Sequence, residues 1–218
     1  MRHSVRLFGD PVLRQRASEI DEIDSRVALM ADGLLPTMYE AEGLGLAAPQ
    51  VGIQKRLFVY DIGDGPQTLV NPEIVESDGE WPFDEGCLSL PGMTFEIIRP
   101  KQVHLVGRDL DGNEVSIEAD ELLARLFLHE LDHLDGVLTL DHLERDVRKA
   151  ALAQWRRRLT DPGGTEAAHF PAGGITDGTA VRNAAAAREP AGGENADGEK
   201  VGGENAGRDP EPAELSLP

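Results

Sequence analysis

The chain has 218 residues and a net charge of −19, so it can form one domain with an additional segment, and its acidity argues against general nucleic-acid binding. Its single cysteine excludes an internal disulfide and suits a reducing compartment. No apolar run approaches transmembrane length, and the first residues, MRHSVRLFGDPVL, lack the pattern of a signal peptide. We therefore expect a cytoplasmic protein that does not enter a membrane.

The first predicted helix lies near the N-terminus. Apolar residues between Ile23 and Met38 recur at helical steps, and Asp24 or Ser25 can cap the start. Pro36 lies inside this pattern and has no backbone NH to donate, so it predicts a kink or an early end.

Strands are predicted in the middle of the chain. Short apolar runs indicate strands at 57–60, 68–70 and 74–75, with a turn at Asn71-Pro72, and alternation at 103–108 and 114–118 around Asp111-Gly112 indicates a hairpin. This order of helix, antiparallel strands and helix predicts an α+β fold. We expect the strands to pack around a central helix carrying HELDH, followed by a C-terminal helix and a tail.

The C-terminal helix is predicted to begin at Asp141. It would turn Leu143, Val147, Ala151 and Leu152 inward and end near the basic cluster 156–158, where cations suit the helix dipole. From Asp161 the composition changes to glycine, alanine, proline and acidic residues, with eleven acidic and four basic residues. Such a segment cannot bury enough apolar surface to order itself. We therefore expect a domain at 1–160 and a disordered acidic tail at 161–218.

HELDH predicts half of a metal site. His129 and His133 are four residues apart on a predicted helix, so both imidazoles lie on one face with Cβ atoms roughly 5–6 Å apart and can reach one ion. Glu130 lies beside the pair and does not need to bind the ion. Asp120 or Ser116 can begin this helix, and Gly136 is well placed to end it.

Cys87 is the best candidate for a third ligand. Hydrolytic zinc sites use three protein ligands and keep one position open for water. The protease pattern HExxHxxGxxH has its glycine here but ends on Thr139, which cannot replace histidine. Cys87 lies in FDEGCLSLPG at the expected end of a strand. One thiolate and two imidazoles would form a distorted tetrahedral site with water in the fourth place.

The residues alone leave other interpretations open. A zinc endopeptidase would need a third His or Glu ligand in place of Cys87. A non-catalytic metal protein would have a closed site, in which Glu130 has no chemical role. Two histidines on an amphipathic helix can also be ordinary core residues, as a lone buried cysteine can be.

Three motifs, in this order, resemble those of the peptide deformylase family. They are GLGLAAPQ at Gly43 to Gln50, EGCLS at Glu85 to Ser89, and HELDH at His129 to His133. The resemblance covers about the first 150–160 residues. It implies a metal-dependent hydrolase that removes the N-formyl group from the initiator methionine of new polypeptides and releases formate.

The resemblance also implies roles for particular residues. The Gln50 amide and the backbone NH of Leu88 would hold the formyl oxygen as it gains negative charge, and Glu130 would pass a proton from water to the leaving amine. Gly45 would lie beside the substrate backbone. The methionine side chain is expected to contact three leucines, Leu44, Leu122 and Leu126.

Cofactor and partners follow from the same resemblance. It implies one divalent metal ion, Fe²⁺ first, with Zn²⁺, Ni²⁺ or Co²⁺ as replacements, and an ion pair of Glu85 with Arg99 that supports the metal motif. Family members commonly have Gln where this chain has Leu128, so we expect one hydrogen bond near the metal to be absent. The expected substrates are N-formyl-methionyl nascent peptides, and the expected state is a monomer. A further hypothesis is that the basic cluster 156–158 contacts the ribosome.

Overall fold

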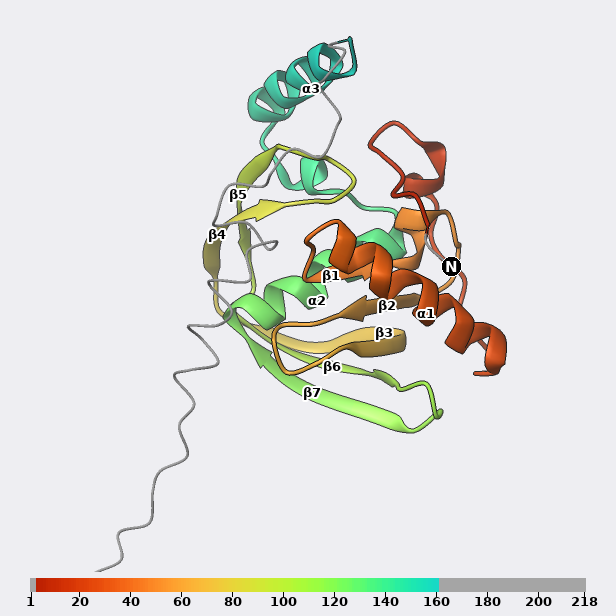
Figure 1. Cartoon of the computed structure of the whole chain (residues 1–218). Coiled ribbons are helices and arrows are strands. Elements are labelled where there is room, and N and C mark those ends of the chain that lie inside the picture. The colour runs from red at the N-terminus through yellow and green to blue at the C-terminus, as the bar shows by residue number, and fades with distance from the viewer. Residues whose placement is uncertain (1–2, 161–218) are drawn as a thin grey trace, which may run out of the picture. The chain divides into compact units, whose positions relative to one another are not determined.

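The computed structural model describes residues 3–160, so the tail expected at 161–218 lies outside the described residues (Figure 1). The α-helices in this range are α1 (Ser25–Glu40), α2 (Glu121–Asp135) and α3 (Arg145–Thr160). The strands are β1 (Gly45–Ala47), β2 (Leu57–Tyr60), β3 (Gln67–Asp78), β4 (Trp81–Gly86), β5 (Thr94–Arg99), β6 (Gln102–Arg108) and β7 (Glu114–Asp120). The mixture of helices with antiparallel strands agrees with the predicted class. Among the described residues, no helix combines the length and apolar character needed to cross a membrane.

The strands form two antiparallel sheets. One sheet has the order β1-β2-β3-β6-β7, and β4 pairs with β5 in the other. The expected hairpin joins β6 to β7, and Gly112 adopts a positive φ of 84° in its turn, which glycine tolerates at no steric cost.

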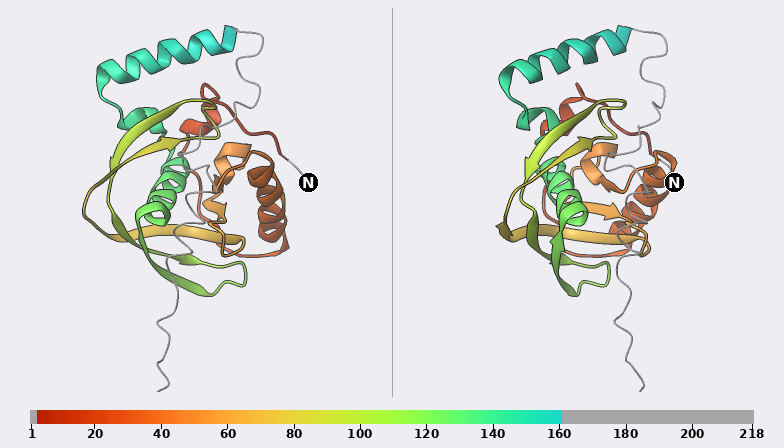
Figure 2. Two further views of the ribbon diagram at one scale, coloured as in Figure 1. Left: turned by 60° about the vertical axis from the view of Figure 1, so that its left-hand side comes forward. Right: turned by 90° about the vertical axis from the view of Figure 1, so that its left-hand side faces the viewer.

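Helices α1 and α2 lie on opposite faces of β1 and β2 (Figure 2). Because side chains alternate along a strand, Phe58 and Tyr60 of β2 pack with Phe127 of α2, whereas Leu57 and Val59 pack into the cluster below α1. Strand β2 is therefore apolar at every position. Helix α2 also packs against β1.

Two expectations about local structure were wrong: the early helix end considered at Pro36 and the turn at Asn71-Pro72. Helix α1 continues past Pro36 to Glu40. The carbonyl that Pro36 leaves without a donor belongs to Asp32, which is exposed and can bond to water. The predicted strands at 68–70 and 74–75 are one strand, β3, in which Asn71 adopts a φ of 50° at a register shift opposite β6. The expected turn at Asn71-Pro72 is therefore a bulge.

Helix α3 begins at Arg145, four residues later than predicted, because residues 139–142 form a short 3₁₀ helix. Ala151 is buried as expected, whereas Val147 is 49% exposed and Trp155 takes the inward position. The indole of Trp155 donates to the carbonyl of Phe8 at 3.1 Å and meets the Phe8 ring edge-on. Helix α3 is thus held against the N-terminal segment.

Candidate metal centre

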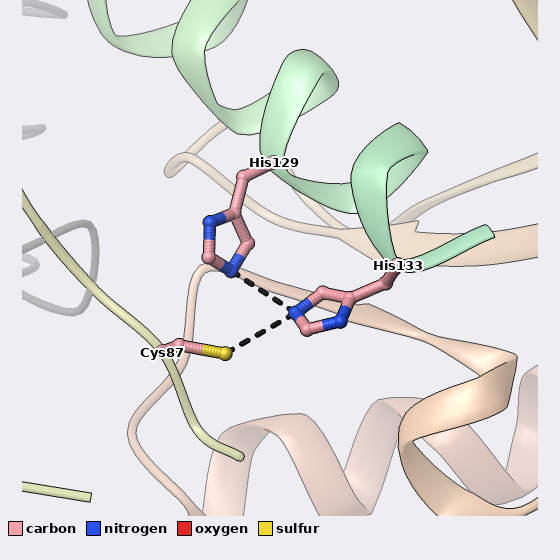
Figure 3. A group of neighbouring side chains, drawn as sticks. All are labelled: Cys87, His129 and His133. Carbon is pink, nitrogen blue, oxygen red and sulfur yellow. Dashed lines mark hydrogen bonds between the residues drawn. The ribbon is translucent and has the colours of Figure 1, made fainter. Parts of the chain in front are cut away.

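Helix α2 presents both histidines of HELDH to Cys87 (Figure 3). The helix has Asp120 at its N-cap and ends at Gly136, which adopts a φ of 76°. Nε2 of His133 lies 3.3 Å from Nε2 of His129 and 3.2 Å from the sulfur of Cys87. All three residues are buried.

Cys87 follows directly after β4, which ends at Gly86. Its backbone carbonyl accepts from the NH of Leu90 at 2.9 Å, so the chain turns immediately after the cysteine. The carbonyl of Ser89 accepts from the NH of Phe8 at 2.7 Å, which ties this turn to the N-terminal segment. The strand end and the turn together place the sulfur opposite the histidines.

The three donor atoms fit one tetrahedral metal ion. All of them lie within 4.8 Å of one another. Ligand distances of about 2.0–2.1 Å to nitrogen and 2.3 Å to sulfur imply separations of roughly 3.3–3.6 Å between ligand atoms in a tetrahedron. The nitrogen pair matches this range, and the sulfur–nitrogen distance is slightly shorter. One sulfur and two imidazole nitrogens suit Zn²⁺, Fe²⁺, Co²⁺ or Ni²⁺.

The protein stabilises the charged form of Cys87. Burial raises the pKa of its thiol, but the imidazoles of His133 and His129 outweigh burial and lower the pKa to about 5. Burial lowers the pKa of His129, yet Glu85 and Cys87 raise it well above its usual value. In the metal-free protein a thiolate therefore faces an imidazolium, and a metal ion has to displace that proton.

Glu85 and Arg99 form the expected ion pair, with both residues buried. Arg99 donates through Nη2 to Oε1 of Glu85 at 2.7 Å, and Nδ1 of His129 lies 2.7 Å from the same oxygen. Although burial raises the pKa of Glu85, Arg99 and His129 hold it well below its usual value. The carboxylate thus orients the His129 ring.

Leu128 lies on a different face of α2 from the two histidines of the metal cluster. Its half-buried side chain packs against the cluster between α2 and the large sheet, and it borders a surface pocket with Leu131 and Ile74. Nδ1 of His129 lies 2.7 Å from Oε1 of Glu85, so this contact does not depend on the side chain at 128. The absence of one hydrogen bond near the metal stays a prediction.

Glu130 reaches the cluster next to Gly45 of β1. Its side chain is 2% exposed, and within residues 3–160 its Oε2 has no hydrogen-bond partner. Burial raises the pKa of Glu130 to about 7. A Cβ at Gly45 would lie 2.4 Å from Oε1 of Glu130, so only glycine leaves room for this carboxylate.

Gln50 faces Cys87, and Leu88 follows this cysteine in the sequence. Oε1 of Gln50 accepts from the backbone NH of Ala47 at 2.8 Å, which turns its Nε2 toward the sulfur of Cys87 at 3.8 Å and the hydroxyl of Ser89 at 3.3 Å. Leu88 directly follows the cysteine and is buried.

The three leucines expected at the methionine side chain belong to one apolar cluster. Leu44 is 8% exposed and Leu122 is half-buried, whereas Leu126 has no exposed surface. Leu126 therefore lies inside the cluster, whereas Leu44 and Leu122 lie nearer its surface.

The structure adds residues that the sequence reasoning missed. Arg125, one turn before His129, donates to Glu85 at 3.0 Å. Asp132 lies 2.8 Å from Nη1 of Arg99 and 2.7 Å from Nε2 of His142. The sequence offered one sign of such a role: the charged Arg125 stands among apolar residues, four positions before His129.

The chain matches known proteins over the part that forms this site. The family model described as polypeptide deformylase matches residues 3–149. A peptide deformylase from Clostridium botulinum is 52% identical over 138 residues, covering 63% of this chain and 94% of the relative. One from Agathobacter rectalis is 51% identical over 141 residues, covering 65% and 89%.

Solved structures agree with these sequence matches. A peptide deformylase crystal structure from Thermotoga maritima has a TM-score of 0.65 and 43% identity, covering 66% of this chain and 99% of that one. One from Legionella pneumophila has a TM-score of 0.70 and 36% identity, covering 73% and 98%.

Proposed function

Since this chain belongs to the polypeptide deformylase family, it removes the N-formyl group from the initiator methionine of new polypeptides and releases formate, and we propose that it does so at Cys87, His129 and His133. The observation that carries this assignment is the convergence of their three donor atoms within 4.8 Å on a buried site. An endopeptidase would need a His or Glu as the third ligand. In the group of possible ligands found among the described residues, the residue that joins His129 and His133 is Cys87.

We propose that the ion is Fe²⁺, with Zn²⁺, Ni²⁺ or Co²⁺ as replacements. The mixed sulfur and nitrogen donor set supports any of these ions, and neither softness nor geometry selects among them. When bound, such an ion acts as a Lewis acid that lowers the pKa of water to near neutrality. The surrounding residues must then orient the substrate and move the proton.

Glu130 is proposed to move the proton. With a pKa of about 7 it can accept a proton from the attacking water and release it to the leaving amine nitrogen near neutral pH. Its unpartnered Oε2 supports this role, because a buried carboxylate oxygen without a donor is costly unless the site uses it.

Gln50 and Leu88 are proposed to stabilise the formyl oxygen as it gains negative charge. The Gln50 amide is held by Ala47, so its NH₂ group faces the cysteine side of the site before substrate arrives. The backbone NH of Leu88 is proposed as the second donor. Gly45 would pass close to the substrate backbone, with Leu44 and Leu122 touching the methionine side chain and Leu126 behind them.

Formate release from a formyl-methionyl peptide tests the residue assignments. Anaerobically prepared wild-type protein is expected to contain one metal ion per chain and to release formate. Glu130→Ala should retain the metal but lose formate release, whereas Cys87→Ser should lose both. A Cys87→Ser protein with full metal and activity would refute the ligand set, and an active Glu130→Ala protein would refute the proton-transfer role.

Ribosome contact through α3 also remains a proposal. Arg156 and Arg157 are exposed, whereas Arg158 donates to the carbonyls of Pro91 at 3.4 Å and Gly92 at 2.8 Å. Arg156 and Arg157 are thus the pair available for an RNA phosphate. If replacing both with Gln leaves co-sedimentation with ribosomes at low salt unchanged, the proposal fails.

Location and assembly are proposed from the sequence. A single, free Cys87 supports a reducing cytoplasm. A monomer is proposed as well, and light scattering at working concentration would test it.

A further inference from the structure

The carboxylate of Glu85 has its acceptor positions filled. Arg99 donates through Nε to Oε2 at 2.8 Å and through Nη2 to Oε1 at 2.7 Å. Arg125 donates through Nη1 to Oε2 at 3.0 Å, and Nδ1 of His129 lies 2.7 Å from Oε1. Because an ionised carboxylate offers about four lone-pair positions, this one cannot rotate without losing a charge-assisted hydrogen bond.

Arg125 has no exposed surface, although it carries a charge. Its Cζ lies 5.2 Å from the centre of the Trp81 ring and 5.5 Å from that of Phe83, and the two rings are stacked 4.6 Å apart. Its Nη2 also donates to the backbone carbonyl of Trp81. A buried arginine needs such partners to offset its lost hydration, and an apolar side chain would fill the position at lower cost.

The position of Arg125 links the two halves of the metal cluster. Arg125 and His129 lie one turn apart on α2, whereas Glu85 lies on β4, two residues before Cys87. The Arg125–Glu85 pair therefore ties the helix that supplies two ligands to the strand that leads directly into the third. Arg99 reaches α2 as well, but only through Asp132.

We propose that Arg125 is a positioning residue of the metal site. By holding Glu85 against Nδ1 of His129, it keeps Nε2 of that ring aimed at the ion and fixes α2 relative to Cys87. Arg99 secures the carboxylate from β5 and Arg125 secures it from α2, so each arginine blocks a different rotation. This inference rests on the proposed ligand set.

The rate of metal loss to a chelator tests the inference, measured on protein loaded with Co²⁺. Arg125→Met keeps the length of the side chain and removes its charge and donors. We expect metal to leave about 10–100-fold faster, as is typical when a partner of a metal-bound histidine is lost, with an altered Co²⁺ absorption spectrum. Arg125→Lys should fall between this variant and the wild type.

Arg56→Met is the matched control. Arg56 is also buried, lies 2.6 Å from Asp135 on α2, and donates to the carbonyl of Pro72 at 3.3 Å, but it contacts no proposed ligand. We expect this variant to lose thermal stability while its metal release stays within about 2-fold of wild type.

A double mutant separates positioning from general stability. In a Glu85→Gln background, Arg125→Met should accelerate metal release no further, because its target is already altered. Equal acceleration in both backgrounds, or release from Arg125→Met as slow as from Arg56→Met, would overturn the proposal. If Arg125→Met does not fold, Arg125→Lys decides, and wild-type release would overturn the proposal. A wild-type protein that binds no metal would instead refute the ligand set.

Discussion

Replacing Gly45 with alanine perturbs the site through one atom. The new Cβ would lie 2.4 Å from Oε1 of Glu130, 3.0 Å from its Cδ and 3.2 Å from its Cγ. Ordinary contacts need roughly 3.4 Å or more, so the carboxylate must move by about 1 Å. A displacement of this size at a catalytic group costs on the order of 100-fold in rate. We therefore expect Gly45→Ala to reduce the rate of formate release by about 100-fold with unchanged metal content.

The same clash predicts a coupling in stability. Overpacking should lower the free energy of unfolding by about 1–3 kcal/mol in the wild-type background. In Glu130→Ala the carboxylate is absent and the new methyl group has room, so the cost should disappear. Urea unfolding of the four proteins measures this coupling. An equal cost in both backgrounds, or a Gly45→Ala protein with wild-type activity, would refute the reasoning.

Gly107→Ala is the control for this experiment. Gly107 lies on β6, and a Cβ there would lie 3.2 Å from the carbonyl oxygen of Val70 and 3.4 Å from Cα of Pro72, both on β3. We expect a change in stability and no change in formate release.

Three further predictions follow from the surroundings of the site. Because the pKa of Glu85 is depressed in the folded state, this carboxylate stabilises the fold above its ordinary pKa of 4.5, and the stabilisation is lost as the pH falls. Glu85→Gln should therefore make the free energy of unfolding less dependent on pH in acid, and an unchanged dependence would contradict this. In metal-free protein, the ultraviolet absorbance of the Cys87 thiolate should persist down to about pH 5, so a transition near 8.5 would disprove the His-stabilised thiolate. Arg158→Met removes the hydrogen bonds to the carbonyls of Pro91 and Gly92, so it should lower the free energy of unfolding by about 1 kcal/mol and speed amide hydrogen exchange at 89–93. Unchanged exchange there would show that these hydrogen bonds do not hold the turn.

The parts of the site that are close in sequence could be predicted. Helical spacing is sufficient to place His129 and His133 on one face, and Gly136 ends the helix by a backbone conformation that favours glycine. The approach of Cys87 depends on the pairing of β4 with β5 and on the turn that follows, which no local pattern encodes. Cys87 was predicted because the two histidines need a third ligand, and the family resemblance supported that choice; periodicity did not predict the contact.

The errors have local physical causes. Asn71-Pro72 is typical of a turn, but a residue with positive φ followed by proline equally suits a bulge in a continuous strand, and only the pairing with β6 distinguishes the two. On α3, Trp155 is buried and Val147 is exposed, contrary to the predicted pattern. The indole of Trp155 donates to the carbonyl of Phe8, which is far away in the sequence, so helical periodicity could not indicate this contact. Arg125 was missed because its partner, Glu85, lies on another element.

X-ray absorption at the metal edge tests the proposed centre most directly. For anaerobically purified protein we predict one sulfur at about 2.3 Å and two imidazole nitrogens at about 2.0–2.1 Å, the shell expected from Cys87, His129 and His133. In Cys87→Ser the sulfur contribution should vanish together with most of the bound metal. A wild-type spectrum with only oxygen and nitrogen neighbours would contradict the account.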